Sequence, residues 1–218
     1  MASRFPLLAC VICALSGLAL APTIAWSQPA SSGKAVSDFD RPLTDQEWGV
    51  LVFGGEMSNH NFEDTLSPFN SRDRADINFA GAAVNRRIRE GRFIDVEVEA
   101  GGGYQFSDSS DNDSAQIWAA LYFRYSRFPW NRFIYTTVAI STGLNYSFNK
   151  TRFEEEEDRK NGTRKLLHYL SPEITFAHPD HKQWEGVLRL HHRSGVYGLF
   201  GCNHCGSNMV TAGVRRKF

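Results

Sequence analysis

Two side chains near the C-terminal end of the chain, His192 and Ser194, have the types and the spacing that nucleophilic catalysis requires. A serine hydroxyl becomes an effective nucleophile when a histidine within hydrogen-bond reach takes its proton. The two residues are two positions apart, so in a β-strand they lie on the same face. The pair is therefore a candidate site for chemistry.

The residues before this pair predict a strand with one apolar face. That face carries Trp184, Gly186, Leu188 and Leu190 ahead of His192 and Ser194, whereas the other face carries Glu185, Val187, Arg189, His191 and Arg193. Polar groups at the end of an apolar stripe are costly against hydrocarbon, which favours chemistry on a lipid. The alternative is a polar pair at a membrane interface, where headgroups and water reduce that cost.

Strand-like runs continue through the rest of the chain, and each is rich in β-branched or aromatic residues. They cover residues 47–58, 75–89, 93–106, 115–126, 132–149, 164–178, 183–194 and 207–218. Most of them alternate apolar with polar residues, and the connections alternate between short and long, as in outer-membrane barrels. The sequence predicts an all-β fold, an eight-stranded antiparallel transmembrane β-barrel over residues 47–218, with the phase of the first two strands left open.

Charged residues on the inner faces predict a filled lumen. The inward acids are Asp95, Glu97, Glu99, Glu173 and Glu185, and the inward bases are Arg124, Arg189, Arg193, Arg215 and Lys217. Eight strands enclose a space just wide enough for side chains. We therefore expect a charge-paired plug, which disfavours a small transport pore.

The N-terminal residues predict export. Arg4 precedes an apolar run over residues 5–21 and the small residues Ala25 and Ser27, which is typical of a secretory signal peptide over residues 1–27. A periplasmic N-terminal segment over residues 28–46 and an outer-membrane location follow from this interpretation. A lipoprotein signal at Cys10 is the alternative, although the motif Leu7-Leu8-Ala9-Cys10 lies near the start of the apolar run and not after it.

Charge and cysteine content narrow the function classes. The chain has 24 basic and 24 acidic residues, so its net charge of zero gives no electrostatic reason to expect nucleic-acid binding. Cys202 and Cys205 predict a disulfide in an exported protein. A zinc clip that adds His204 is the alternative, but three ligands within four residues make poor tetrahedral geometry. We expect no metal and no cofactor.

Two acidic runs, residues 108–113 and 154–158, fall in predicted outer loops. Carboxylates there are suitable ligands for the divalent cations that bridge lipopolysaccharide phosphates. The irregular spacing of these carboxylates favours solvated acidic loops instead.

The ending of the chain resembles the lipid A 3-O-deacylases of the PagL type, which are eight-stranded outer-membrane barrels. The resemblance rests on His192-Arg193-Ser194 near the top of the penultimate strand, the long loop that follows, and Asn208, the eleventh residue from the C-terminus. It implies that Ser194 is the nucleophile, His192 the general base and Asn208 the residue that orients the imidazole. Asn208 departs from the family, which has a carboxylate at this position.

The same resemblance implies lipopolysaccharide as the partner and removal of an ester-linked acyl chain as the reaction. Backbone N–H groups beginning with that of Gly195 would stabilise the oxyanion, and Leu188 and Leu190 would contact the acyl chain. Phe218, with Gly213 and Thr211 upstream, resembles the signal read by the barrel-assembly machinery, although Arg216 departs from it.

A second hypothesis is a non-enzymatic or catalytically degenerate outer-membrane barrel that stabilises the envelope or binds a surface partner through its loops. The sequence leaves the oligomeric state open.

Overall fold

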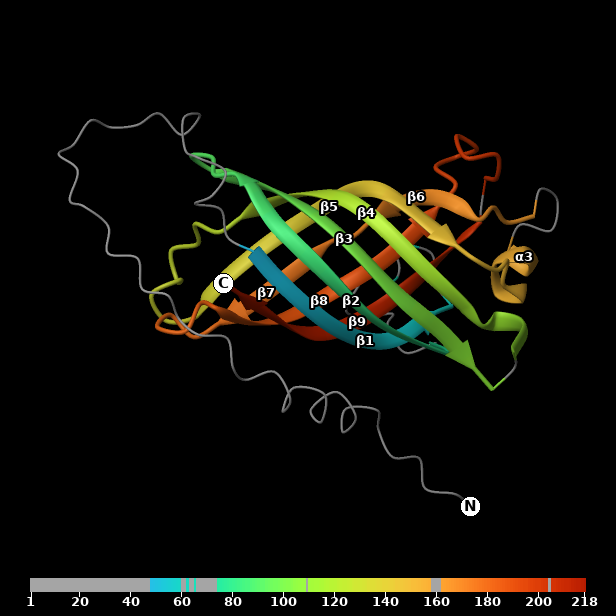
Figure 1. Cartoon of the computed structure of the whole chain (residues 1–218), viewed down its shortest axis with the longest axis horizontal. Helices are drawn as coiled ribbons and strands as arrows, with labels where there is room; N and C mark the ends of the chain where they lie inside the picture. The colour runs from blue at the N-terminus through green and yellow to red at the C-terminus, as the bar shows by residue number, and fades with distance from the viewer. Residues whose placement is uncertain are drawn as a thin grey trace, which may run out of the picture.

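The chain folds into a closed antiparallel β-barrel (Figure 1). The structure is a computed structural model that describes residues 48–59, 62, 65, 74–108, 110–157, 162–203 and 205–218. The predicted signal peptide and periplasmic segment, residues 1–46, lie outside the described residues. The strands are β1 (Trp48–Ser58), β2 (Arg74–Arg89), β3 (Ile94–Ser107), β4 (Ser114–Tyr125), β5 (Tyr135–Ser147), β6 (Leu166–Leu170), β7 (Glu173–Ala177), β8 (Trp184–Ser194) and β9 (Gly206–Lys217).

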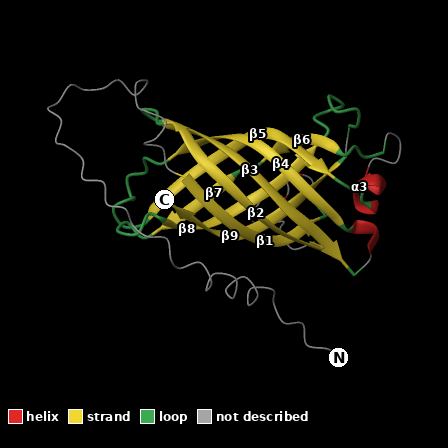
Figure 2. Cartoon of the chain, in the orientation of Figure 1, coloured by secondary structure: helices red, strands yellow, loops and turns green. Residues whose placement is uncertain are grey.

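Strands that follow one another pair, except that β6 and β7 each pair with β5 and β8 instead of with each other. The pairing of β1 with β9 closes the barrel. Two short helices, η2 (Ser110–Asn112) and α3 (Arg152–Glu157), complete the described elements. Figure 2 shows that α3 lies at one end of the barrel and the C-terminus at the other. The predicted eight-stranded antiparallel barrel is confirmed.

The sixth predicted strand, residues 164–178, is divided into β6 and β7. The division falls at Ser171 and Pro172, and a proline has no N–H to donate to the ladder. The register against β5 and β8 continues unchanged across the gap, with Tyr169 opposite Gly143 and Glu173 opposite Ala139. The two segments therefore occupy one position in the barrel wall, and the prediction missed only the interruption.

The structure shows which side chains of the first two strands point into the lumen. Leu51, Phe53 and Met57 of β1 are buried in the lumen with Ile77 and Phe79 of β2. A register shift lies between Glu56 and Ser58, and a second lies between Arg87 and Arg89. Such irregularities disturb the simple alternation that a sequence pattern needs.

The outer surface of the barrel is apolar around its circumference. Exposed hydrophobic side chains include Val50, Val84, Val98, Ile117, Leu121, Phe123, Ile140, Leu144, Leu188, Val210 and Val214. Because these alternate with buried lumen residues along each strand, the wall presents one oily face outward, as membrane-spanning barrels do. Within the described residues, no helix has the length and apolarity needed to cross a membrane.

Charged side chains fill the lumen around Glu173. Its carboxylate is bound by Arg124, Arg189 and Arg215, with nitrogen to oxygen distances of 2.8, 2.6 and 2.7 Å. Four further ion pairs extend the network: Arg124 with Glu97, Arg189 with Glu99, Arg215 with Glu185 and Lys217 with Glu185. The predicted charge-paired plug is confirmed.

Two residues predicted to join this network lie elsewhere. Asp95 accepts a hydrogen bond from the Gly91 amide at 3.1 Å and is 4.0 Å from Arg87, at the end of the barrel near the β2–β3 turn. Arg193 pairs with Glu154 of α3 at 3.3 Å, at the opposite end. The prediction that the Arg193 side chain points into the lumen was correct. Its partner, Glu154, lies in the connection between β5 and β6, where the periodicity of a strand gives no information.

An aromatic layer lies beyond the charge network, centred on His191. The rings of Phe79, Trp118 and Tyr169 are within 4.9 Å of the imidazole centroid. Gln116 and Asn145 lie 3.3 Å from its Nε2 atom. His191 is therefore a lumen packing residue, as its inward phase predicted.

Candidate functional site

His192 and Ser194 lie on the outer, lipid-facing side of β8. Their neighbours His191 and Arg193 are fully buried in the lumen, so alternation places the even-numbered residues outside. Leu188, lower on the same stripe, is 52% exposed. Leu190 is only 6% exposed, so the expectation that it is open to an acyl chain is wrong. Leu188 alone presents such a surface on this part of the stripe.

The β8–β9 hairpin brings His192 and Asn208 together. They are direct cross-strand partners, and the His192 Nδ1 to Asn208 Oδ1 distance is 2.5 Å. An amide oxygen is only an acceptor, so it requires the proton on Nδ1 and leaves Nε2 of a neutral imidazole as the acceptor. The contact therefore fixes the tautomer that a general base needs.

Ser194 lies two residues further along β8, opposite Gly206. Gly206 has a φ of 134°, and a Cβ atom there would meet the Arg193 carbonyl oxygen. Glycine is thus required, and it leaves the β9 side of Ser194 without a side chain. Among the described residues, no hydrogen bond joins Ser194 to His192; such bonds are often long in unliganded enzymes and shorten when substrate binds.

The loop after Ser194 is tightly tied. Cys202 and Cys205 form the predicted disulfide, with a Cα to Cα distance of 5.8 Å. Phe200 N–H donates to the Gly195 carbonyl, and Gly195 N–H donates to the Cys205 carbonyl at 3.2 Å. The expectation that the Gly195 N–H is available to an oxyanion is therefore wrong, because hairpin closure already uses it.

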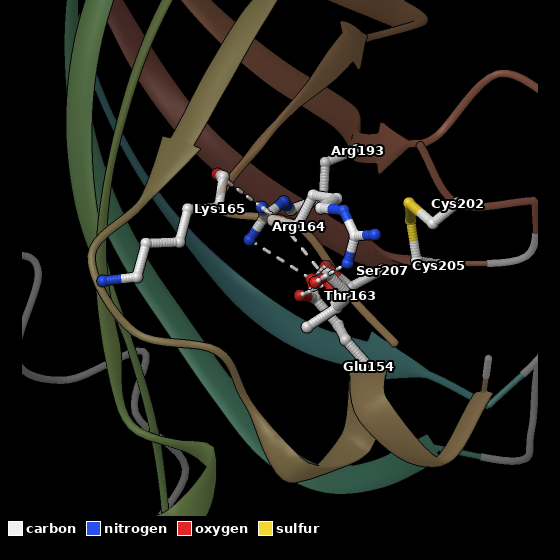
Figure 3. Close-up of a disulfide and its surroundings, with 8 residues drawn as sticks. All are labelled: Glu154, Thr163, Arg164, Lys165, Arg193, Cys202, Cys205 and Ser207. Carbon is white, nitrogen blue, oxygen red and sulfur yellow. Dashed lines mark hydrogen bonds and ion pairs between the residues drawn. A yellow bond between two sulfur atoms is a disulfide. The ribbon is translucent and has the colours of Figure 1, made fainter. Parts of the chain in front are cut away.

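Side chains inside the barrel hold the two site strands from behind (Figure 3). Glu154 of α3 accepts hydrogen bonds from Ser207 at 3.1 Å and Thr163 at 3.0 Å, and it pairs with Arg193. Arg193 lies between His192 and Ser194, and Ser207 precedes Asn208. Glu154 therefore ties the inner face of the hairpin to α3, and the prediction that its acidic run is a solvated loop is wrong for this residue.

Three nearby residues escaped the sequence analysis. The Phe62 ring packs against His192 with ring centroids 4.6 Å apart. Ser58 of β1 is the cross-strand partner of Asn208. His168 of β6 is the partner of Ser194 on the other side. All three depend on pairings between distant segments, and no local motif indicates them.

The arrangement places a serine hydroxyl and a histidine imidazole two residues apart on a surface that faces lipid. Within the part of the chain that the structure describes, no group of three His, Cys, Asp or Glu residues is arranged to hold a metal ion. These are the residue types that acyl transfer uses, with an amide in the place where many hydrolases have a carboxylate.

The chain matches no protein-family model and no curated protein sequence. Among solved structures, it is similar to the N-terminal β-barrel domain of Pseudomonas aeruginosa OprF, at 11% identity and a TM-score of 0.45, over 79% of this chain and 97% of that one. Ail, the attachment invasion locus protein of Yersinia pestis, matches at 9% identity and a TM-score of 0.40, over 79% and 98% of the two chains. OprG from P. aeruginosa matches at 10% identity and a TM-score of 0.40, over 79% and 94%. These low values assign no chemistry to the site.

Proposed function

We propose that this barrel is an outer-membrane esterase that removes an ester-linked acyl chain from lipid A. The observation that supports it best is the hydrogen bond between His192 and Asn208 on the lipid-facing side of the hairpin, with Ser194 two residues beyond. The end of the barrel that carries α3 and the disulfide loop would face outward, so these residues would meet the leaflet that holds lipopolysaccharide.

The proposed reaction begins with attack of Ser194 Oγ on the ester carbonyl carbon while His192 Nε2 takes the hydroxyl proton. The tetrahedral intermediate collapses when the carbon–oxygen bond to the sugar breaks, and His192 returns the proton to the departing sugar oxygen. Water, deprotonated by His192, then attacks the acyl-serine; the bond between the acyl carbon and Ser194 Oγ breaks, His192 returns the proton to Oγ, and a free fatty acid is released. Asn208 accepts the hydrogen bond from Nδ1–H throughout, so the proton is exchanged at Nε2 in both steps.

Mass spectrometry of lipid A tests the proposal directly. Cells that produce the wild-type chain should lose one ester-linked hydroxyacyl chain from lipid A, whereas cells that produce Ser194→Ala should not. Ser110→Ala in the β3–β4 connection is the matched control and should behave as wild type. Heat-modifiable gel migration verifies that each barrel is assembled. Intact lipid A beside a correctly assembled wild-type barrel would contradict the esterase.

Asn208→Glu should raise the hydrolysis rate. An amide positions the imidazole but supplies no negative charge for the imidazolium that forms, whereas a carboxylate does both. Because the orienting role is already filled, we expect a gain of about tenfold, a small part of what a complete triad contributes. Initial rates on purified lipid A in detergent would measure it, with Asn208→Asp as a shorter comparison. An unchanged or lower rate for both variants would show that the site does not work through this contact.

A non-enzymatic surface role is the competing function, and the loop between β8 and β9 favours it. Tyr197 and Leu199 are 92% and 78% exposed at the tip of this loop. Large apolar side chains held outward in this way are typical of contacts with a partner. The lipid A experiment separates the two functions, because a purely structural or adhesive barrel leaves every acyl chain in place.

A further inference from the structure

A second polar pair lies on the lipid-facing surface beside Ser194. His168 of β6 is the direct cross-strand partner of Ser194, and its Nε2 atom lies 2.9 Å from Thr142 Oγ1 of β5. Directly paired residues on one face of a sheet have Cβ atoms about 5 Å apart. A polar surface therefore runs from Asn208 through His192 and Ser194 to His168 and Thr142, across four neighbouring positions of the wall.

The surroundings of this second pair are apolar. Leu144, the cross-strand partner of His168, is 48% exposed, and Leu166, two residues before His168, is also exposed on the same face. Leu170, two residues after it, faces outward as well and pairs with His192. Polar groups set among lipid-facing leucines are costly unless a polar ligand reaches them, and residues of this kind mark functional sites.

The geometry does not favour a second general base. The wall order is β8, β6, β5, so Thr142 lies on the far side of β6 from Ser194. Its hydroxyl holds Nε2, the outermost ring nitrogen of His168. The imidazole is thus anchored away from the serine, and its remaining nitrogen, Nδ1, is the one available to a ligand. Binding fits this arrangement better than proton transfer at Ser194.

We propose that His168 and Thr142 bind the polar linkage region of the lipid whose ester Ser194 attacks, through its carbonyl, hydroxyl and phosphate oxygens. The inference rests on the proposed function, since it places that substrate across β8 and β6. The bound lipid spans the two polar pairs, with its scissile ester at Ser194 and its neighbouring linkage at His168. His168 is on this basis a positioning residue.

Binding of lipid A to the Ser194→Ala protein is the first test, because the ligand is not consumed. Native mass spectrometry in detergent would compare Ser194→Ala with Ser194→Ala/His168→Leu and Ser194→Ala/Thr142→Val. We expect about tenfold weaker binding for the His168 variant and a few-fold weaker binding for the Thr142 variant, the range for losing one or two hydrogen bonds. Ser194→Ala/His178→Leu changes an exposed histidine at the other end of the barrel and should bind as Ser194→Ala does.

Kinetics of the single variants give the second readout. His168→Leu should raise KM for lipid A with kcat within about twofold of wild type, as expected when uniform binding is lost. A small fluorophosphonate, which has no linkage region, should label Ser194 at the wild-type rate. Unchanged lipid A binding would overturn the proposal. Slower fluorophosphonate labelling would also overturn it, because His168 would then act on Ser194 itself.

Phosphatidylethanolamine distinguishes the source of the ligand oxygens. Equal weakening for both lipids supports binding of the carbonyl and phosphate groups that they share, whereas weakening confined to lipid A supports contacts to the sugar. The experiments distinguish failure of the His168 binding site from failure of the proposed esterase. If lipid A binding needs His168 but the wild-type protein leaves lipid A intact, the binding site stands and the esterase does not.

Discussion

Ser194→Ala and His192→Ala, each assayed as a purified barrel, are expected to lower the rate of lipid A hydrolysis by at least about 10³-fold. The serine variant has no nucleophile, and the histidine variant has no general base to take the serine proton. The His192–Asn208 contact fixes Nε2 as the acceptor, so no other nitrogen of this ring replaces it. Release of free hydroxy fatty acid, followed by mass spectrometry, measures the rate.

The double variant is the sharper test of a shared mechanism. Residues that act as one unit are strongly non-additive, so Ser194→Ala/His192→Ala should be about as slow as either single variant. Fluorophosphonate labelling should disappear in all three proteins and persist in Ser110→Ala. Losses that multiply in the double variant, or labelling that persists without His192, would show that the two residues do not act together.

Glu173→Gln is expected to destabilise the barrel by about 3–5 kcal/mol, the cost of breaking a buried ion pair from one side. Glu173 is fully buried and is bound by Arg124, Arg189 and Arg215. The amide keeps the shape of the side chain but removes the negative charge that these three guanidinium groups share. Each arginine keeps a second carboxylate: Glu97 for Arg124 at 2.8 Å, Glu99 for Arg189 at 2.7 Å, and Glu185 for Arg215 at the longer distance of 3.2 Å.

Glu156→Gln is the matched control for this stability measurement. It removes an equally short ion pair, with Arg152 at 2.7 Å, on the exposed surface of α3. Exposed pairs of this kind contribute little to stability, because solvent screens them, so the unfolding midpoint should stay close to that of wild type. Urea unfolding in detergent micelles, followed by tryptophan fluorescence and heat-modifiable migration, gives both values. Equal midpoints for the two variants would show that Glu173 is not the centre of the lumen network.

Local pattern was enough for most of the barrel. Alternation in β3, β4 and β5 fixes which side chains face the lumen, because successive residues of a strand point to opposite faces. The inward position of Glu97, Glu99 and Glu173 follows from that rule alone. Pro172 shows where the alternation rule fails. The strand pattern of the sequence continues through this residue, but proline has no N–H for the hydrogen-bond ladder between strands, and β6 and β7 are separate.

The candidate site divides in the same way. The shared face of His192 and Ser194 is a property of one strand, and the antiparallel register of β8 and β9, which are consecutive strands, places Asn208 opposite His192. Phe62, Ser58 and His168 come from segments that are 24 to 134 residues away from His192 in sequence, and only barrel closure and strand order bring them to its neighbourhood.

By itself, then, the sequence determined the barrel, the inward charges, the disulfide pair and the lipid-facing position of His192 and Ser194, because each depends on residues close together along the chain. Tertiary structure alone decided the partner of Arg193, the burial of Glu154 and Leu190, and the use of the Gly195 amide by Cys205. Those features depend on how loops fold over a closed wall, and the periodicity of a strand ends where its loop begins.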